Sequence, residues 1–274
     1  MNPLAAFGRD RTHWLVSVAV LDAVNARVPE MSDHGSYFTA TAISHNFGSP
    51  VLWFAMIAAA VIAFAQGREP EPLRRGDGAI VLAGLVAALL PMPRAGALMV
   101  AAIGAWLVLT ALAGSRAWRA GVVLSALAGT LVWGQFVLAL IGRFVLPIDG
   151  ALAGLFGQVV QTGNVLRFPD SNETMVIADG CSSLHNVTVA LLLWATLTQL
   201  LEIRLSRSSL GVCLAAILAN VAVNVVRLVT LVHHRAAFDY WHSGSGGALF
   251  AWAGLTASAV IVYGGCFALA PRRV

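Results

Sequence analysis

The stretch that decides the fold is residues 209–232, SLGVCLAAILANVAVNVVRLVTLV, in which Arg227 is the only charged residue. An apolar run of this length satisfies the roughly 20 residues that a helix needs to cross the hydrocarbon core of a bilayer. Similar runs recur along the chain, which is 58% hydrophobic and 11% charged, with a mean hydropathy of +0.79. The composition therefore predicts a polytopic membrane protein.

The apolar runs predict an all-α membrane protein: a polytopic bundle of about eight transmembrane helices in one integral-membrane domain over residues 1–274. The first run contains Asp22 and follows two arginines, as a secretory signal would, but it lacks a good cleavage pattern and is counted as a span. Residues 28–47 are expected to form an irregular outer loop. The spans are expected near residues 12–27, 48–66, 77–92, 95–113, 119–142, 182–201, 209–232 and 246–269.

The arginines predict the orientation, with both termini in the cytoplasm. Eleven of them then fall in inner segments and five in outer ones, as the positive-inside rule requires. Scattered arginines argue against a nucleic-acid partner, and the absence of any Lys excludes a Lys-based catalytic dyad. The inner set is Arg9, Arg11, Arg68, Arg74, Arg75, Arg116, Arg119, Arg204, Arg207, Arg272 and Arg273, and the outer set is Arg27, Arg94, Arg143, Arg167 and Arg235.

The outer segment 143–180 is long enough to have structure of its own. The run Pro147–Gln161 is too short to span a membrane and predicts an interfacial or re-entrant helix. After it, Asn164–Phe168 and Glu173–Ile177 flank the turn sequence Pro-Asp-Ser-Asn, which predicts a short outer hairpin.

Cys181 follows this hairpin in the polar stretch IADGCSSLHN, residues 177–186. The predicted orientation places it at the outer, N-terminal end of the helix that starts at Ser182. Cys213 and Cys266 fall in apolar sequence near inner helix ends and are expected to be small buried hydrophobes. No second Cys is available outside for a disulfide, so a reactive thiol is the better interpretation of Cys181.

Arg227 lies one to two turns inside its span, where a charge costs a few kcal/mol. Snorkelling to the outer head groups is the alternative explanation. However, Asn220, Asn224 and Arg227 are spaced i, i+4, i+7 and form one polar stripe. The stripe is expected to face the bundle interior, where the guanidinium could stabilise a thiolate or an oxyanion.

Two histidines could act with Cys181, and the residues alone do not choose between them. His242 lies in the outer loop before the last span, whereas His185 lies one turn below Cys181 on the same helix. His233 and His234 add further imidazoles near the outer face. No metal-ligand spacing such as HExxH occurs, so neither a metal nor a cofactor is expected.

Together these motifs resemble the exosortase/archaeosortase family of membrane-embedded cysteine transpeptidases. The resemblance rests on Cys-Ser within Ala178–Leu184, on Asn-Val-Val-Arg at 224–227 and on a His before the final span. It implies Cys181 as nucleophile, Arg227 as electrostatic partner and His242 as general acid and base. The supporting residues would be Asn224, Asn220, His185 and Ser182. The family usually has Gly two residues after the Cys, where this chain has Ser183.

The resemblance also implies the activity and the partners. The enzyme would be a cysteine protease or transpeptidase of the bacterial inner membrane, with its site facing the periplasm, that acts through a thioester. Its substrates would be exported proteins that end in a short motif, a transmembrane helix and an Arg-rich tail, as in the PEP-CTERM class; the acceptor stays open. The alternatives are a small transporter or channel with an Asn/Arg anion site, or a non-catalytic scaffold of polysaccharide export.

Overall fold

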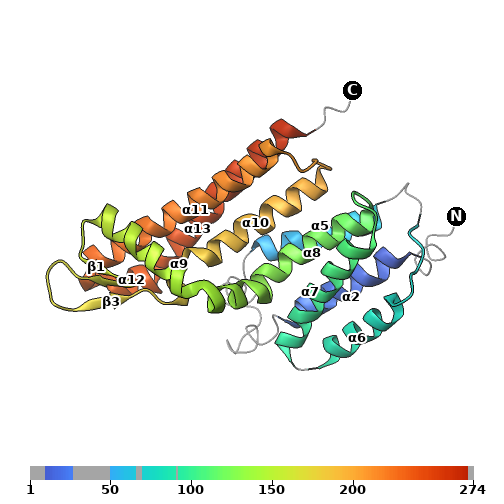
Figure 1. The fold of residues 1–274 in the computed structure, drawn as a ribbon, viewed down its shortest axis with the longest axis horizontal. Helices are drawn as coiled ribbons and strands as arrows, with labels where there is room; N and C mark the ends of the chain where they lie inside the picture. Colours follow the sequence, from blue (N-terminus) through green and yellow to red (C-terminus); the bar gives the residue numbers. More distant parts are fainter. Residues whose placement is uncertain (1–9, 27–49, 66–69, 91, 271–274) are drawn as a thin grey trace. The chain divides into compact units, whose positions relative to one another are not determined.

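The computed structural model describes residues 10–26, 50–65, 70–90 and 92–270. The chain divides into two compact units, Met1–Trp133 with Ala195–Glu202, and Gly134–Trp194 with Ile203–Val274. Helices make up most of both units (Figure 1), as the sequence predicts. The outer loop predicted at 28–47 lies outside the described residues.

The first unit is a helical bundle. Helix α7 packs on α8 and α2, and α5 also packs on α8. Two glycines allow α7 and α8 to approach closely: a Cβ at Gly104 would lie 2.7 Å from Ser125 N, and one at Gly121 would lie 2.7 Å from Leu107 Cβ. Small residues serve this purpose at membrane helix contacts. The elements are α2 (Arg11–Asn25), α5 (Pro50–Phe64), α6 (Asp77–Leu89), α7 (Pro93–Thr110), α8 (Arg116–Ala128) and the π-helical turn η1 (Gly129–Trp133).

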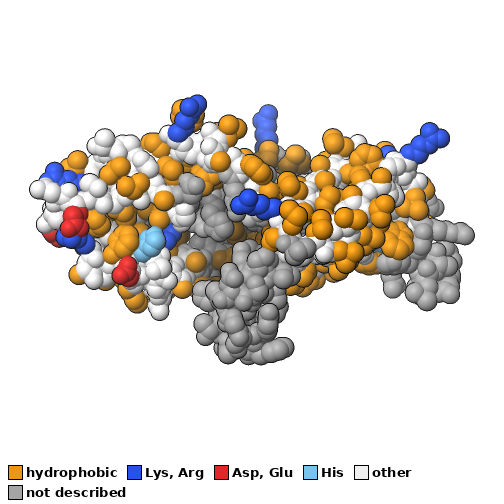
Figure 2. All heavy atoms as spheres, turned by 90° about the horizontal axis from the view of Figure 1, so that it is seen from below, with side chains coloured by type: hydrophobic (Ala, Val, Ile, Leu, Met, Phe, Trp, Pro, Cys, Tyr) orange, Lys and Arg blue, Asp and Glu red, His pale blue; other side chains and the backbone are white. Residues whose placement is uncertain are grey.

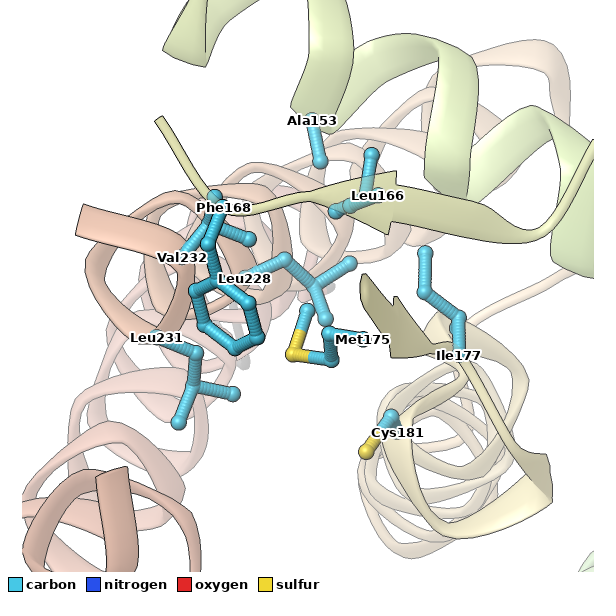
Figure 3. Close-up of a cluster of buried hydrophobic side chains, with 9 residues drawn as sticks. All are labelled: Ala153, Leu166, Phe168, Met175, Ile177, Cys181, Leu228, Leu231 and Val232. Carbon is cyan, nitrogen blue, oxygen red and sulfur yellow. The ribbon is translucent and has the colours of Figure 1, made fainter. Parts of the chain in front are cut away.

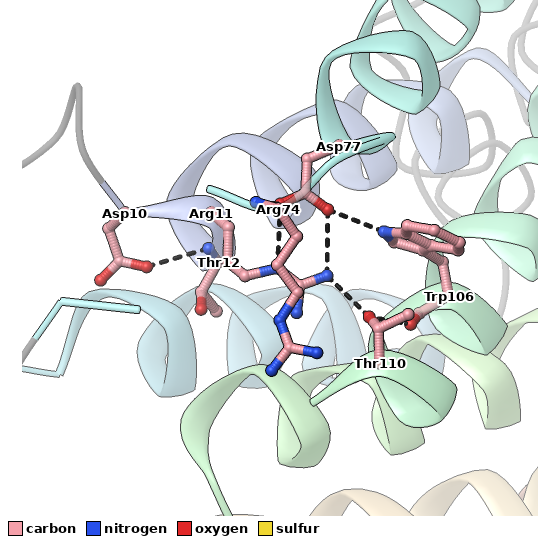
Figure 4. A network of polar contacts seen from close by, with 7 residues as sticks. All are labelled: Asp10, Arg11, Thr12, Arg74, Asp77, Trp106 and Thr110. Atoms are coloured by element: carbon pink, nitrogen blue, oxygen red, sulfur yellow. Dashed lines mark hydrogen bonds and ion pairs between the residues drawn. The ribbon is translucent and has the colours of Figure 1, made fainter. Parts of the chain in front are cut away.

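Buried ion pairs join the helix starts of this first unit (Figure 4). The guanidinium of Arg11 donates from Nε to Asp77 Oδ2 at 3.1 Å and from Nη2 to Asp77 Oδ1 at 3.0 Å. Trp106 Nε1 donates to the same carboxylate at 2.7 Å. Arg116 forms a second buried ion pair with Asp10. Pairing and hydrogen bonding are what make buried charges tolerable.

The second unit combines long helices with a small sheet. Helix α11 packs on α13 and α9. The predicted hairpin is confirmed, since β2 and β3 pair antiparallel with Leu166 opposite Met175. Strand β1 pairs with the other side of β2 and was not predicted. The elements are α9 (Gly134–Gly157), β1 (Gln161–Thr162), β2 (Val165–Arg167), β3 (Thr174–Val176), the 3-10 turn η2 (Asp179–Cys181), α10 (Ser183–Leu200), α11 (Arg207–His233), the 3-10 turn η3 (Arg235–Ala237), α12 (Phe238–His242) and α13 (Ser245–Leu269); the residues of α10 from Ala195 on belong to the first unit.

The prediction of a separate re-entrant helix at Pro147–Gln161 is wrong. Helix α9 runs unbroken from Gly134 to Gly157, through Pro147. An internal Pro removes one backbone hydrogen bond and crowds the preceding turn, yet apolar membrane helices tolerate this loss. The helix ends only where Gln158 adopts a left-handed φ of 51°, a common way for a helix to stop. Residues predicted as a span end plus a short helix therefore form one helix.

Four helices of the described chain are long and apolar enough to cross a membrane: Pro93–Thr110, Phe136–Gly157, Arg207–His233 and Ser245–Leu269. Shorter apolar helices cover Pro50–Phe64, Asp77–Leu89 and Asn186–Leu200. Large apolar side chains point outward, among them Leu89 and Leu109, which are 85% and 81% exposed. Figure 2 shows hydrophobic side chains spread over the visible face. A helical membrane protein fits these features, and the count of eight spans stays a prediction.

Candidate active site

Cys181 lies in the second unit at the end of the short turn η2, two residues before α10 begins. Its backbone N–H donates to Ala178 O at 2.9 Å. The side chain is 7% exposed and is part of a compact apolar cluster (Figure 3). The sequence prediction placed Cys181 at the helix start, and the structure places it in the turn that leads into the helix.

The apolar cluster joins the hairpin to helix α11 around the thiol. Phe168 and Met175 come from the two sides of the hairpin, and Leu228 and Leu231 come from α11. Phe238 and Trp241, from α12, pack against it. Burial of these side chains holds the hairpin, the Cys181 turn and α12 together. The full cluster is Ala153, Leu166, Phe168, Met175, Ile177, Cys181, Leu228, Leu231 and Val232.

His242 is the imidazole that the structure brings to Cys181. Its Nε2 lies 3.5 Å from Cys181 Sγ, although 61 residues separate the two in sequence. The ring of Phe238 stacks on the His242 ring with centroids 5.1 Å apart and planes 13° apart. A thiol within hydrogen-bond reach of an imidazole can transfer its proton, which is the arrangement that an activated nucleophile needs.

Arg227 contacts the segment that carries His242. Its Nη2 donates to the backbone carbonyl of His242 at 3.1 Å, at the end of α12. Its Nε is buried and has no hydrogen-bond partner among the described residues. A buried charged donor without a partner is costly to keep. The free N–H is a donor available to a bound group with negative charge.

Asn224 lies on α11 one helical turn before Arg227 and holds the Cys181 turn in place. Its Nδ2 donates to Cys181 O at 3.0 Å, and its side chain is 1% exposed in total. Because a carbonyl oxygen can only accept, this bond also fixes the orientation of the amide. One of the two N–H groups on Nδ2 is thus bonded to the Cys181 turn, and this bond supports the turn.

Asn220 does not reach the site. Its Nδ2 donates to Ala216 O at 3.0 Å and also to Ser258 Oγ on α13. The polar stripe on α11 is therefore real, since Asn220 and Asn224 are both buried. Its members have separate partners: Asn220 ties α11 to α13, and Asn224 and Arg227 contact the Cys181 and His242 segments.

Asp149 is a site residue that sequence reasoning missed. This carboxylate from α9 is 1% exposed and accepts Ser182 Oγ at 3.2 Å, Ser183 N at 3.0 Å and Ser183 Oγ at 2.7 Å. Ser182 Oγ in turn accepts Leu184 N at 3.2 Å, as an N-cap does. The amides of Ser183 and Leu184, the first two of α10, thus already have acceptors. Ser183, which stands where the sequence resemblance leads us to expect Gly, donates its hydroxyl to the Asp149 carboxylate.

Of the other candidate histidines, His233 and His234 have partners of their own. His185 is in the first turn of α10, and its side chain lies outside what the structure describes. His233 Nε2 contacts Gly157 O at 2.8 Å, and the His234 ring lies 6.3 Å from the Trp241 ring. Within the described residues, no three His, Cys, Asp or Glu side chains are grouped to hold a metal ion.

Comparison with known families identifies the family of the chain. The family model described as transmembrane exosortase matches residues 38–258. The chain belongs to the transmembrane exosortase family. No curated protein and no solved structure gave a match.

The exosortase match covers most of the chain and includes the candidate residues Cys181, Arg227 and His242. Membership makes the protein a membrane protein of a sorting-related transpeptidase family, as the sequence motifs predict. The roles of individual residues are not fixed by membership and stay predictions. Cys213 and Cys266 are buried in helices, as expected of small hydrophobes, and all three cysteines are free thiols.

Proposed function

We propose that this exosortase cleaves the C-terminal sorting signals of exported proteins, with Cys181 as nucleophile. The observation that carries the proposal is the 3.5 Å contact between Cys181 Sγ and His242 Nε2. Near it, Arg227 holds the His242 backbone and keeps one buried donor free. Thiol, imidazole and guanidinium are the groups that acyl transfer through a thioester requires.

In the proposed reaction, Cys181 gives its proton to His242 and the thiolate attacks the carbonyl carbon of the scissile peptide. The carbonyl oxygen becomes an oxyanion, which Arg227 Nε–H stabilises; removing one such donor typically costs about 10²–10³-fold in rate. The C–N bond then breaks, and His242 returns the proton to the leaving amine. Water or an amine acceptor, deprotonated by His242, finally attacks the thioester and releases the thiol.

The substrate class and the location are also part of the proposal. We place the site at the outer face of the bacterial inner membrane, with both termini in the cytoplasm, because arginines are concentrated in the predicted inner loops. A substrate with a short motif, a transmembrane helix and an Arg-rich tail would obey the same charge rule. Its motif would then emerge at the outer face, level with Cys181.

Co-expression with such an exported protein tests the proposal. The parent is expected to shorten the protein, and Cys181→Ala is expected to leave it at full length. Cys213→Ala is the matched control, because it removes a buried thiol far along another helix. Processing that persists in Cys181→Ala would refute the catalytic role.

A trapping experiment tests the intermediate. Hydroxylamine attacks thioesters, so adding it during turnover should release the shortened protein as a C-terminal hydroxamate. Mass spectrometry of the product distinguishes the hydroxamate from a free carboxylate or from transfer to another amine. Turnover without any hydroxamate at high hydroxylamine would count against a thioester.

A further inference from the structure

The small sheet beside Cys181 has a free edge. Its strand order is β1-β2-β3, so among the described residues β3 pairs with β2 alone. The opposite edge, β1, is two residues long and packs against α9. An edge strand presents unpaired backbone N–H and C=O groups to any extended chain that approaches it. Strand β3 is thus the position where the sheet can accept another strand.

The pairing register identifies the backbone groups on this edge. Ile177 N donates to Asn164 O at 2.8 Å, so Ile177 belongs to the set of residues that bond to β2. Bonded and non-bonded residues alternate in an antiparallel ladder, so the N–H and C=O groups of Thr174 and Val176 point away from β2. In the described chain nothing bonds to these groups. Both residues are exposed, Val176 to 58%.

Side-chain contacts hold the hairpin against the segment Arg235–His242 in the absence of a ligand. Glu173, which directly precedes β3, forms an ion pair with Arg235. The carbon of the same guanidinium lies 5.8 Å from the centroid of the Phe168 ring. The rings of Phe168 and Phe238 form a T-shaped pair with centroids 6.4 Å apart. These contacts tie the hairpin to the segment that ends in His242. A strand held in this way requires little ordering when a ligand binds.

The free edge lies next to the thiol. Met175, between the two edge residues, belongs to the same buried cluster as Cys181. In Figure 3 Cys181 is drawn on the side of β3 opposite to β2. Neighbouring strands lie about 4.8 Å apart, so a chain paired with β3 runs along the wall of the site.

We propose that the free edge of β3 binds the polypeptide substrate as an added extended strand, paired to the backbone of Thr174 and Val176. The proposal rests on the proposed function, since it describes how that site holds its substrate. Backbone pairing supplies affinity whatever the side chains are, and pockets for alternate side chains add specificity. In an added strand, every second substrate residue bonds to β3 and the residues between them do not.

A change in the enzyme backbone tests this edge. Val176→Pro removes one N–H from the free edge and leaves the bonds to β2 intact, since a Pro is tolerated where its nitrogen faces away from the ladder. Val176→Thr keeps that N–H and the branched side chain. The probe is acetyl-tetraalanyl chloromethyl ketone, which alkylates Cys181 in the full chain in detergent, with Cys213 and Cys266 replaced by Ala.

The expected result is that Val176→Pro reacts with the peptidyl probe about three- to tenfold more slowly than Val176→Thr, the effect of one hydrogen bond. The rate with chloroacetamide, which has no peptide backbone to pair, should be equal in both variants. Equal rates with the peptidyl probe would overturn the proposal. So would a change confined to the oligomeric state, because the edge would then pair two copies of the chain.

A change in the probe gives an independent test on the unaltered edge. N-methylation of one alanine at a time removes one N–H from the probe. The rate should fall at alternate alanines only, with a period of two, and no alternation would overturn strand addition. Failure of the proposed function looks different, because processing of the exported protein would then continue in Cys181→Ala.

Discussion

Replacing Arg227 by Lys tests whether the guanidinium serves two acceptors at once. In the structure Nη2 donates to His242 O at 3.1 Å, and Nε is buried without a partner among the described residues. Lys keeps the charge but has a compact ammonium in place of a planar fork. One ammonium on a flexible stem is not expected to hold the His242 carbonyl and stabilise an oxyanion from the same position.

The expected fall in kcat/KM of Arg227→Lys depends on which of the two acceptors loses its hydrogen-bond donor. If the ammonium stays on the His242 carbonyl, the oxyanion loses a donor, which costs about 10²–10³-fold in rate. If it moves to the oxyanion, His242 loses a hydrogen bond from a charged group, about 1.5–3 kcal/mol or roughly 10- to 150-fold. Either way Arg227→Lys should lower kcat/KM by at least about tenfold.

The assay is cleavage of a fluorogenic peptide that carries the sorting motif, by purified full-length protein in detergent. Arg207→Lys is the matched control, because Arg207 is exposed at the other end of the same helix. An unchanged thermal midpoint of the purified variant shows that the protein remains folded. Near-normal cleavage by Arg227→Lys would show that Arg227 is a packing or snorkelling residue.

Three further predictions follow from the site. A small membrane-impermeant thiol reagent applied to spheroplasts should label Cys181 and not Cys213; the reverse pattern would invert the orientation. His242→Ala should abolish peptide cleavage and His185→Ala only reduce it, because His242 Nε2 already contacts Cys181 Sγ; an inactive His185→Ala beside an active His242→Ala would reverse the assignment. Asp149→Ala should lower the free energy of unfolding by about 2–3 kcal/mol, for three hydrogen bonds of about 1 kcal/mol each; an unchanged thermal midpoint would contradict this.

Local sequence signals predicted the hairpin but not the length of α9. The turn residues between Phe168 and Glu173 are a backbone signal, and the strands form where this signal places them. The run Pro147–Gln161 was predicted as a separate helix because it is too short to span a membrane by itself, whereas α9 continues through Pro147 and joins most of this run to the apolar residues before it. The span count rests on loop charges and lengths, which the described helices do not decide.

In the candidate site, too, local sequence predicted some residues and not others. Cys181 and Arg227 stood out because each is out of place for its residue type in a membrane protein. The contact between His242 and Cys181 could be found only from the fold, since 61 residues separate the two in sequence. The choice between His242 and His185 as the catalytic base stays a prediction. Asp149 was missed because its local sequence does not indicate that Ser182 and Ser183, more than thirty residues away, are its hydrogen-bond partners.

The buried pair of Arg11 and Asp77 has a consequence for how the protein is made. Each residue begins a different helix, α2 or α6, and each would be an uncompensated charge until the other arrives. Neither helix can therefore bury its charge in the packed bundle without the other. A single replacement should leave a lone buried charge, worth roughly 3–5 kcal/mol, and mark the chain for degradation. Replacing both by apolar residues should restore its level in the cell, as pulse-chase labelling can measure.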